Sequence, residues 1–422
     1  MTTETTHEAE FEDAQKDLSP IERKLTTGVG LFVGLLALVM VALPVIQALA
    51  RKVADTEIPS ASVIVQHLTL WIGFLGALLA AGTGKHLALS TVEAIPKGWP
   101  RRVASLLTRV TAAAVCALLA YASWKVVQAD ADSGRTVVGS FPVSWSEGIM
   151  PFAFAVMALR FAWRVGKEPQ SWIDRGVALV AIVLAFALGK FMPSSGLMTV
   201  LLVIIAIAFL SGAPVFVVMG AVAMVLFWHD DTPIAAVPAE TFRLVSSATL
   251  PAIPLLTIAG YVLAEGGAAK RLVKAYKGFF GWMPGGVAIM ATVVCAVFTT
   301  FTGGSGVTIL ALGGLLLPML KEEGYPEGFS MGLVTASGSL GLLFPPSLPV
   351  ILYSVVASVP VAHLFLGGLV PGLLMMAMVA AYGIFMGIRH KIARQKFKPK
   401  DAGLGLWEAK WDLGLPVIVI AT

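Results

Sequence analysis

The sequence predicts an all-α membrane protein whose chain crosses the bilayer several times. Hydrophobic residues make up 57% of the 422 residues and charged residues only 13%, whereas soluble domains are about 25% charged. A helix needs ~20 mostly apolar residues to cross ~30 Å of hydrocarbon, and runs of that kind recur along the chain. The runs are continuously apolar rather than alternating, which favours helices over the strands of a membrane barrel. This composition excludes a soluble enzyme.

The first 165 residues predict a regular scaffold of membrane helices. Residues 1–26 form an N-terminal tail, of which residues 1–20 are acidic and polar. No basic region of the kind found in signal peptides precedes the first apolar run, so that run is expected to be retained and not cleaved. The candidate spans of the 27–165 unit are 27–49, 63–82, 104–126 and 146–164. A further span at 176–192, within residues 166–194, is expected to connect this unit to the rest of the chain.

Basic residues near the ends of the spans predict the orientation of the chain, because cytoplasmic loops are enriched in Lys and Arg. One loop has Lys85, Lys97, Arg101 and Arg102, and another has Arg160, Arg164, Lys167 and Arg175. We therefore expect these loops, the N-terminus and the basic segment at 389–412 to be cytoplasmic, and the loop at 127–145 to be outside. Such loops explain the formal net charge of +5, so no nucleic-acid partner is expected.

The composition changes at about residue 195, and residues 195–422 read as a second unit. Gly, Pro, Ser and Thr interrupt its apolar segments. A break inside hydrocarbon leaves backbone groups unbonded, at a cost of several kcal/mol each, and is tolerated only beside protein or a water-filled cavity. The carbonyl groups freed at such breaks coordinate cations in secondary transporters. The pattern therefore indicates broken helices around an ion or substrate site.

The segment 298–308 is the first of two interruptions that point to such a site. It is rich in Thr and Ser and has three glycines in eleven residues. One interpretation is a face of small residues that packs helices together, with its hydroxyls bonded within their own helix. We prefer the tip of a re-entrant hairpin, since clustered glycines destabilise a continuous helix.

The segment 335–349 is the second interruption. Its three prolines, Pro345, Pro346 and Pro349, are incompatible with a helix interior. An ordinary loop between spans would carry charge, yet residues 328–388 contain no Asp, Glu, Lys or Arg. We therefore expect a buried, functional unwinding of a membrane helix.

The remaining polar and reactive residues suggest no catalytic chemistry. Cys116 and Cys295 are far apart and indicate neither a disulfide nor a metal site. Lys85 and His86 read as a solvated helix end, and His229 with its two aspartates reads as a polar external loop. The stretch 265–277 reads as a basic amphipathic helix in the membrane interface. No G-x-x-x-x-G-K-[ST] sequence occurs, so nucleotide hydrolysis is not expected.

Ordered motifs in the second unit resemble the large membrane subunit of a TRAP (tripartite ATP-independent periplasmic) transporter. They are the sequences at 250–260, 266–273, 281–286, 298–308, 317–318, 324–325, 339–347 and 365–372. Residues 1–165, with Trp71-Ile-Gly-Phe-Leu-Gly76, are similar to the small subunit of the same family. The whole chain resembles a fused small and large subunit, with residues 166–194 as the fusion helix.

The resemblance implies a permease of the bacterial inner membrane and not an enzyme. It would be a Na⁺-driven secondary importer of organic acids, such as dicarboxylates or sialic acid, working by an elevator movement. A periplasmic substrate-binding protein would deliver the substrate. In the family, backbone carbonyls at the hairpin tip and the unwound segment hold Na⁺. The matching positions are Ser305, Gly341, Phe344 and Pro346, with Thr308 and Ser347 beside them. Phe344 departs from the family, where a smaller aliphatic residue is usual.

The family's large subunit has two inverted repeats, and the chain ends at Thr422, where the second repeat should begin. We therefore expect a truncated or split chain, with a separate chain supplying the second repeat. Two alternative functions stay open from the sequence. One is a scaffold or assembly subunit that does not transport, and the other is an anion:sodium symporter that works without a binding protein. The region similar to the small subunit argues against the symporter.

Overall fold

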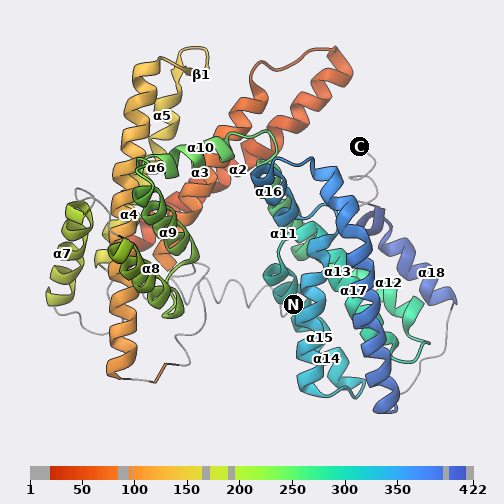
Figure 1. Ribbon diagram of the computed structural model, residues 1–422. Coiled ribbons are helices and arrows are strands. Elements are labelled where there is room, and N and C mark those ends of the chain that lie inside the picture. The colour runs from red at the N-terminus through yellow and green to blue at the C-terminus, as the bar shows by residue number, and fades with distance from the viewer. Residues whose placement is uncertain are drawn as a thin grey trace. The chain divides into compact units, whose positions relative to one another are not determined.

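The computed structural model describes residues 20–83, 95–96, 98–163, 172–188, 195–392 and 399–414 (Figure 1). Several predicted features lie outside these ranges, namely Lys85, His86, Lys398, most of the 1–26 tail and the terminal run 415–422. The chain forms two compact units that divide between Ser246 and Ser247. Helices α8 and α9, which follow the predicted boundary at 195, belong to the first of these units.

The first unit is helical apart from one small hairpin of strands. Strands β1 (Thr136–Val138) and β2 (Phe141–Pro142) pair antiparallel, with Val138 opposite Phe141. The helices are α2 (Pro20–Ala54), α3 (Ala61–Thr83), α4 (Trp99–Ser133), α5 (Val143–Glu147), α6 (Ile149–Trp163), α7 (Trp172–Leu188), α8 (Ser195–Leu210), α9 (Val215–His229) and α10 (Ala236–Val245). Helices α2 and α4 extend beyond the predicted spans 27–49 and 104–126 at both ends, because their apolar centres continue into polar turns that remain helical.

Small residues on α4 explain the packing of this unit. Ala112 and Cys116 are fully buried, and they lie in one apolar core with Ala153 of α6 and Val217 of α9. A short side chain lets neighbouring helices approach closely, which is how membrane helices pack when water supplies no driving force between them. Cys116 therefore has a packing role, and both cysteines are free and buried.

The second unit contains helices and no strand in the residues that the structure describes. Its elements are α11 (Ala252–Glu265), α12 (Ala268–Phe280), α13 (Gly286–Thr302), α14 (Ser305–Glu322), α15 (Glu327–Leu340), the 3₁₀ turn η2 (Gly341–Leu343), α16 (Leu348–Ala357), α17 (Val361–Arg389) and α18 (Pro399–Glu408). Helix α13 is central, because Met290, Val294 and Phe298 are buried in one core with residues of α12, α14 and α15.

The described helices agree with a polytopic membrane protein. Four of them are long and apolar enough to span a bilayer: residues Arg23–Ala54, Ala61–Ala81, Trp99–Ser133 and Val361–Arg389. Two bent helix pairs, α11 with α12 and α15 with α16, would raise the number to six. Many large apolar side chains are exposed on these helices, as expected for surfaces that face lipid. The predicted all-α fold class with interrupted helices is confirmed.

Candidate functional site

The predicted hairpin tip lies between α13 and α14. Helix α13 ends at Thr302, and Gly303 adopts a left-handed backbone conformation with φ of 64°. Its amide donates to the Thr299 carbonyl over 2.9 Å, which closes the last turn of the helix. A side chain at Gly303 would also overlap Leu348 at the start of α16. This position therefore requires glycine both for its backbone conformation and for a close contact.

Side-chain hydroxyls connect the two arms of the hairpin. The Thr308 hydroxyl oxygen lies 2.9 Å from that of Thr299 and 2.9 Å from that of Thr302. In a continuous helix, residues nine apart would be separated by ~13 Å along the axis. The contact between Thr299 and Thr308 is therefore possible only because the chain reverses direction at the tip, as predicted.

The same network extends to α15. The Thr299 hydroxyl oxygen lies 2.7 Å from the Cys295 carbonyl oxygen and 3.0 Å from the Gly338 carbonyl oxygen. A hydroxyl has one proton, so Thr299 can donate to only one of these carbonyls at a time. The three threonines and their carbonyl neighbours thus form a buried cluster in which oxygen acceptors outnumber the available protons.

The second predicted interruption separates α15 from α16. After α15 ends at Leu340, the chain makes one 3₁₀ turn and continues without helix from Phe344 to Ser347. The helices on the two sides are bent by 43° relative to each other. Pro346 and Ser347 are buried, and the peptide bond between Pro345 and Pro346 is cis. The predicted unwinding is confirmed.

The hairpin and the unwound segment contact each other directly. A side chain at Gly341 would overlap the Ala296 carbonyl and the Thr299 side chain, both on α13. On the other side of the break, Leu348 contacts Gly303 at the tip. The structure therefore brings together two sequence segments that were predicted separately.

The predicted sodium-site residues have distinct places in this junction. Ser305 is the first residue of α14, and its carbonyl oxygen lies 3.6 Å from the position of a Cβ on Gly338. Thr308 is fully buried within the hydroxyl cluster. The Gly341 carbonyl accepts a hydrogen bond from the Phe344 amide at 3.1 Å. The Ser347 hydroxyl is buried and has no hydrogen-bond partner among the residues described.

Phe344, the position that departs from the family pattern, packs against α17. Its Cζ atom lies 3.0 Å from where a Cβ on Gly372 would be, and its Cε1 atom lies 3.2 Å from that point. Gly372 therefore provides the space that the larger aromatic ring needs. The Phe344 ring is thus directed toward α17.

Thr299, Thr302 and Gly338 belong to the junction but were missed by sequence reasoning. A signal for the threonines was present, since Thr299 and Thr302 are three residues apart and share one face of a helix. Gly338 could not be identified, because only helix packing places its carbonyl beside Thr299. Within the described parts of the chain, no group of three His, Cys, Asp or Glu residues could hold a metal ion.

A separate polar cluster lies at the end of α4 in the first unit. Arg135 forms an ion pair with Asp130, and this hydrogen bond raises the pKa of Arg135. Glu147 is fully buried. Asp130 and Arg135 also line a cavity of about 740 Å³, together with Lys125 and Arg243.

Two family models match the chain. The model described as the DctM component of tripartite ATP-independent periplasmic transporters matches residues 198–422, and the model of the DctQ component matches residues 40–167. The DctM match covers more than half of the chain. The protein belongs to the TRAP transporter family. The resemblance inferred from the sequence is thereby confirmed, and the family is one of transporters and not of enzymes.

Curated TRAP relatives match parts of the chain at similar sequence identities. The C4-dicarboxylate TRAP transporter large permease protein DctM of Vibrio cholerae is 35% identical over 214 residues, which are 50% of this chain and 47% of that protein. The isethionate TRAP transporter permease protein DctMQ of Oleidesulfovibrio alaskensis is 30% identical over 280 residues, 64% of this chain and 44% of that protein. The ectoine/5-hydroxyectoine TRAP transporter large permease protein UehC of Ruegeria pomeroyi is 30% identical over 174 residues, 41% of each chain.

The chain spans about half the length of the curated relatives that it matches. Matches to both TRAP membrane components within one chain agree with the predicted fusion of a small and a large subunit. The junction between the hairpin and the unwound segment lies entirely in the DctM-like part.

Proposed function

We propose that the chain forms the permease part of a sodium-coupled TRAP importer of organic acids. The observation that carries this proposal is the buried junction of the α13–α14 hairpin with the break between α15 and α16. Discontinuous helices of this kind form the substrate and ion sites of secondary transporters. In this junction the polar groups are hydroxyls and carbonyls, and the segments that form it contain no ionisable side chain.

The groups at the junction suit a small monovalent cation. Na⁺ takes neutral oxygen ligands, and the cluster has an excess of oxygen acceptors together with the unpartnered Ser347 hydroxyl. The residues that would hold Na⁺ are Ser305, Gly341, Phe344 and Pro346, mainly through their carbonyls, with Thr308 and Ser347 as neighbours. A bound Na⁺ would supply the charge through which a sodium gradient drives uptake. Thr299 and Thr302, through their contacts with Thr308, would hold the two arms of the hairpin together around the ion.

An organic acid is the substrate class that this arrangement favours. Helices α14 and α16 both begin at the junction, and helix N-termini attract anions through their free amides and their dipole. The relatives named above are called transporters of C4-dicarboxylates, isethionate or ectoine. We infer a small organic acid whose anionic group lies near these N-termini, delivered by a periplasmic binding protein, since TRAP permeases work with such proteins.

The chain is proposed to reside in the bacterial inner membrane. Its N-terminus and the 389–412 segment would be cytoplasmic, with the loop at 127–145 outside. This orientation follows from the distribution of Lys and Arg.

Ion binding can be tested on the purified protein without any substrate. Na⁺ that binds only the folded state raises its unfolding temperature, whereas K⁺ at the same ionic strength serves as the reference. Thr299→Val removes the hydroxyl that joins α13, α14 and α15, and we expect it to abolish most of the Na⁺-specific rise. The matched control is Thr335→Val on α15, because the exposed Thr335 hydroxyl bonds only to Met331 of its own helix.

Coupling is tested by uptake. The complete transporter, with its binding protein, is reconstituted in liposomes, and accumulation of a labelled organic acid is followed. Uptake should require an inward Na⁺ gradient and no ATP. Unchanged uptake after Na⁺ is replaced by K⁺ on both sides would contradict the proposal.

A further inference from the structure

Helix α18 packs against α12 by close contact of their backbones. A Cβ on Gly405 would lie 2.8 Å from the Cα of Ala275 and 3.3 Å from the Lys274 carbonyl oxygen, so only glycine allows this approach. Ala409, one turn further along, is fully buried in the core that contains Leu272 and Ala275 of α12. A turn at Ala409 and a further helical turn at 410–414 continue α18 beyond its end at Glu408. The side of this continued helix that carries Gly405, Ala409 and Asp412 therefore faces α12.

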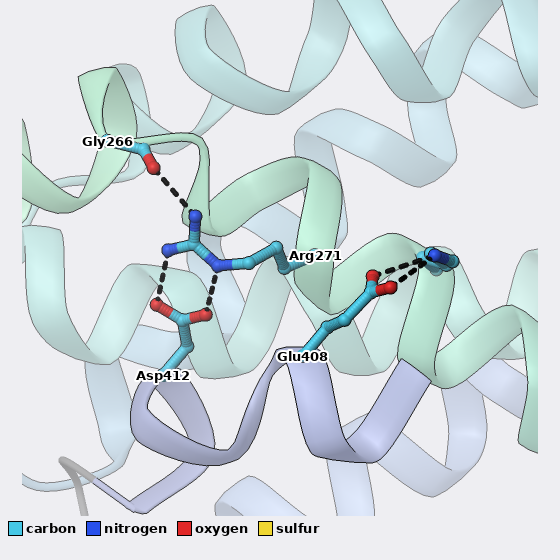
Figure 2. Close-up of polar contacts among 5 residues, drawn as sticks. Gly266, Arg271, Glu408 and Asp412 are labelled. Carbon is cyan, nitrogen blue, oxygen red and sulfur yellow. Dashed lines mark hydrogen bonds and ion pairs between the residues drawn. The ribbon is translucent and has the colours of Figure 1, made fainter. Parts of the chain in front are cut away.

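Two ion pairs hold the helices together (Figure 2). Arg271 donates to both carboxylate oxygens of Asp412, at 2.7 and 2.9 Å, and its third nitrogen donates to the Gly266 carbonyl at 2.8 Å. Lys274 contacts both oxygens of Glu408 at 2.7 Å. These acidic groups, which follow the basic 389–400 segment, are thus neutralised by α12.

The opposite side of α18 is apolar, aromatic and positively charged. Leu404, Trp407 and Trp411 are exposed by 56%, 69% and 71%. The Lys410 ammonium lies 3.7 Å from the ring centroid of Trp407 and 5.8 Å from that of Trp411. Between Arg389 and Asp412 the sequence has seven basic and three acidic residues. Glu408 and Asp412, two of these three acidic residues, are paired with α12, so the segment has an excess of positive charge.

We propose that the outer face of α18 and of the helical turn at 410–414 that continues it, defined by Leu404, Trp407, Lys410 and Trp411, is a binding surface for anionic lipid headgroups. Tryptophan and lysine are the side chains that settle where hydrocarbon meets water, since each has an apolar body and a polar end. Clusters of basic residues that closely follow a membrane helix or lie on an amphipathic helix bind anionic lipids. The basic run at 389–400 is of the first kind, because it begins at the end of α17, a helix long enough to span the bilayer.

The ion pairs with α12 give this contact a wider effect. A lipid-bound α18 would also hold α12 at the membrane surface, and α12 leads directly into the hairpin helix α13. This surface does not depend on sodium coupling or on the identity of the substrate.

A fluorescent label at position 403 tests the proposal. Gly403 is exposed, a side chain there meets no atom within 4 Å, and it lies one turn before Trp407 on the same face. The label is attached to Gly403→Cys in the full chain, with Cys116→Ala and Cys295→Ala, in bilayers of phosphatidylcholine and phosphatidylglycerol. We expect brominated lipid to quench the label, with brominated phosphatidylglycerol more effective than brominated phosphatidylcholine. A label at Ser140→Cys, in the exposed β1–β2 turn, is the reference for a position quenched by iodide in water.

Lys410→Gln tests the charge alone. One basic residue near an anionic surface strengthens binding about fivefold, so the preference for phosphatidylglycerol should fall by about that factor. The ion pairs with α12 do not involve Lys410, and the unfolding temperature should stay the same. Quenching at 403 by iodide to the level seen at 140 would overturn the proposal in favour of a solvated face. A label shielded from both quenchers would overturn it in favour of a covering protein, and equal quenching by the two lipids would refute the anionic preference.

Discussion

Replacing Gly341 by alanine should damage the proposed ion site through packing alone. Gly341 has φ of −63° and ψ of −17°, a right-handed conformation that alanine adopts without strain. The new methyl group would nevertheless overlap the Ala296 carbonyl and the Thr299 side chain, and its distance to the Thr300 amide nitrogen would be 3.1 Å. We expect α13 and the unwound segment to separate by about 1 Å, and such overpacking costs roughly 1–3 kcal/mol.

The matched control is Gly314→Ala on α14. Gly314 is also helical, yet no atom lies within 4 Å of the position of its Cβ. Alanine there should be neutral or stabilise the protein by up to ~1 kcal/mol, because it lowers the entropy of the unfolded chain. The two variants therefore add the same methyl group in different surroundings.

The measurement is thermal unfolding of each variant in Na⁺ and in K⁺. Gly341→Ala should lower the unfolding temperature in both salts and weaken Na⁺ binding at least about tenfold. A loss of ~1.4 kcal/mol in the free energy of Na⁺ binding is enough for a tenfold weakening. Gly314→Ala should keep the Na⁺ response of the unmodified protein. If Gly341→Ala unfolds at the original temperature and responds normally to Na⁺, the close contact between the hairpin and the unwound segment is not required, and the reasoning is wrong.

Three further outcomes are expected. Ser305→Ala should change Na⁺ affinity less than about threefold if its carbonyl is the ligand, and a loss as large as that of Gly341→Ala would instead indicate ligation by the hydroxyl. Asp412→Asn should cost roughly 1–3 kcal/mol of stability by leaving Arg271 without its carboxylate partner, and equal unfolding temperatures of the variant and the unmodified protein would count against the ion pair. A cysteine at Lys398 should be labelled only from the cytoplasmic side in intact cells, and labelling from the periplasm would reverse the proposed orientation.

Local chemistry made much of the architecture predictable from the sequence. The apolar runs predicted membrane helices because each run must satisfy its own backbone hydrogen bonds in lipid. The breaks at Gly303 and at Pro345 were equally visible, since glycine and proline act on the backbone of their own segment. These features depend on residues that are close together in the chain, so they can be predicted from local sequence patterns.

Tertiary packing decided which of these segments meet. The contact of Thr299 with Gly338 joins residues that are 39 apart, and the Arg271–Asp412 pair joins residues that are 141 apart. Neither partner carries a local signal for the other, because the pairing follows from how close glycine and alanine allow whole helices to approach. The same dependence explains Phe344, whose large ring is accommodated only because α17 places Gly372 against it. Composition and local patterns thus determined the spans and their breaks, whereas the oxygen cluster and the ion-paired helices exist only through helix packing.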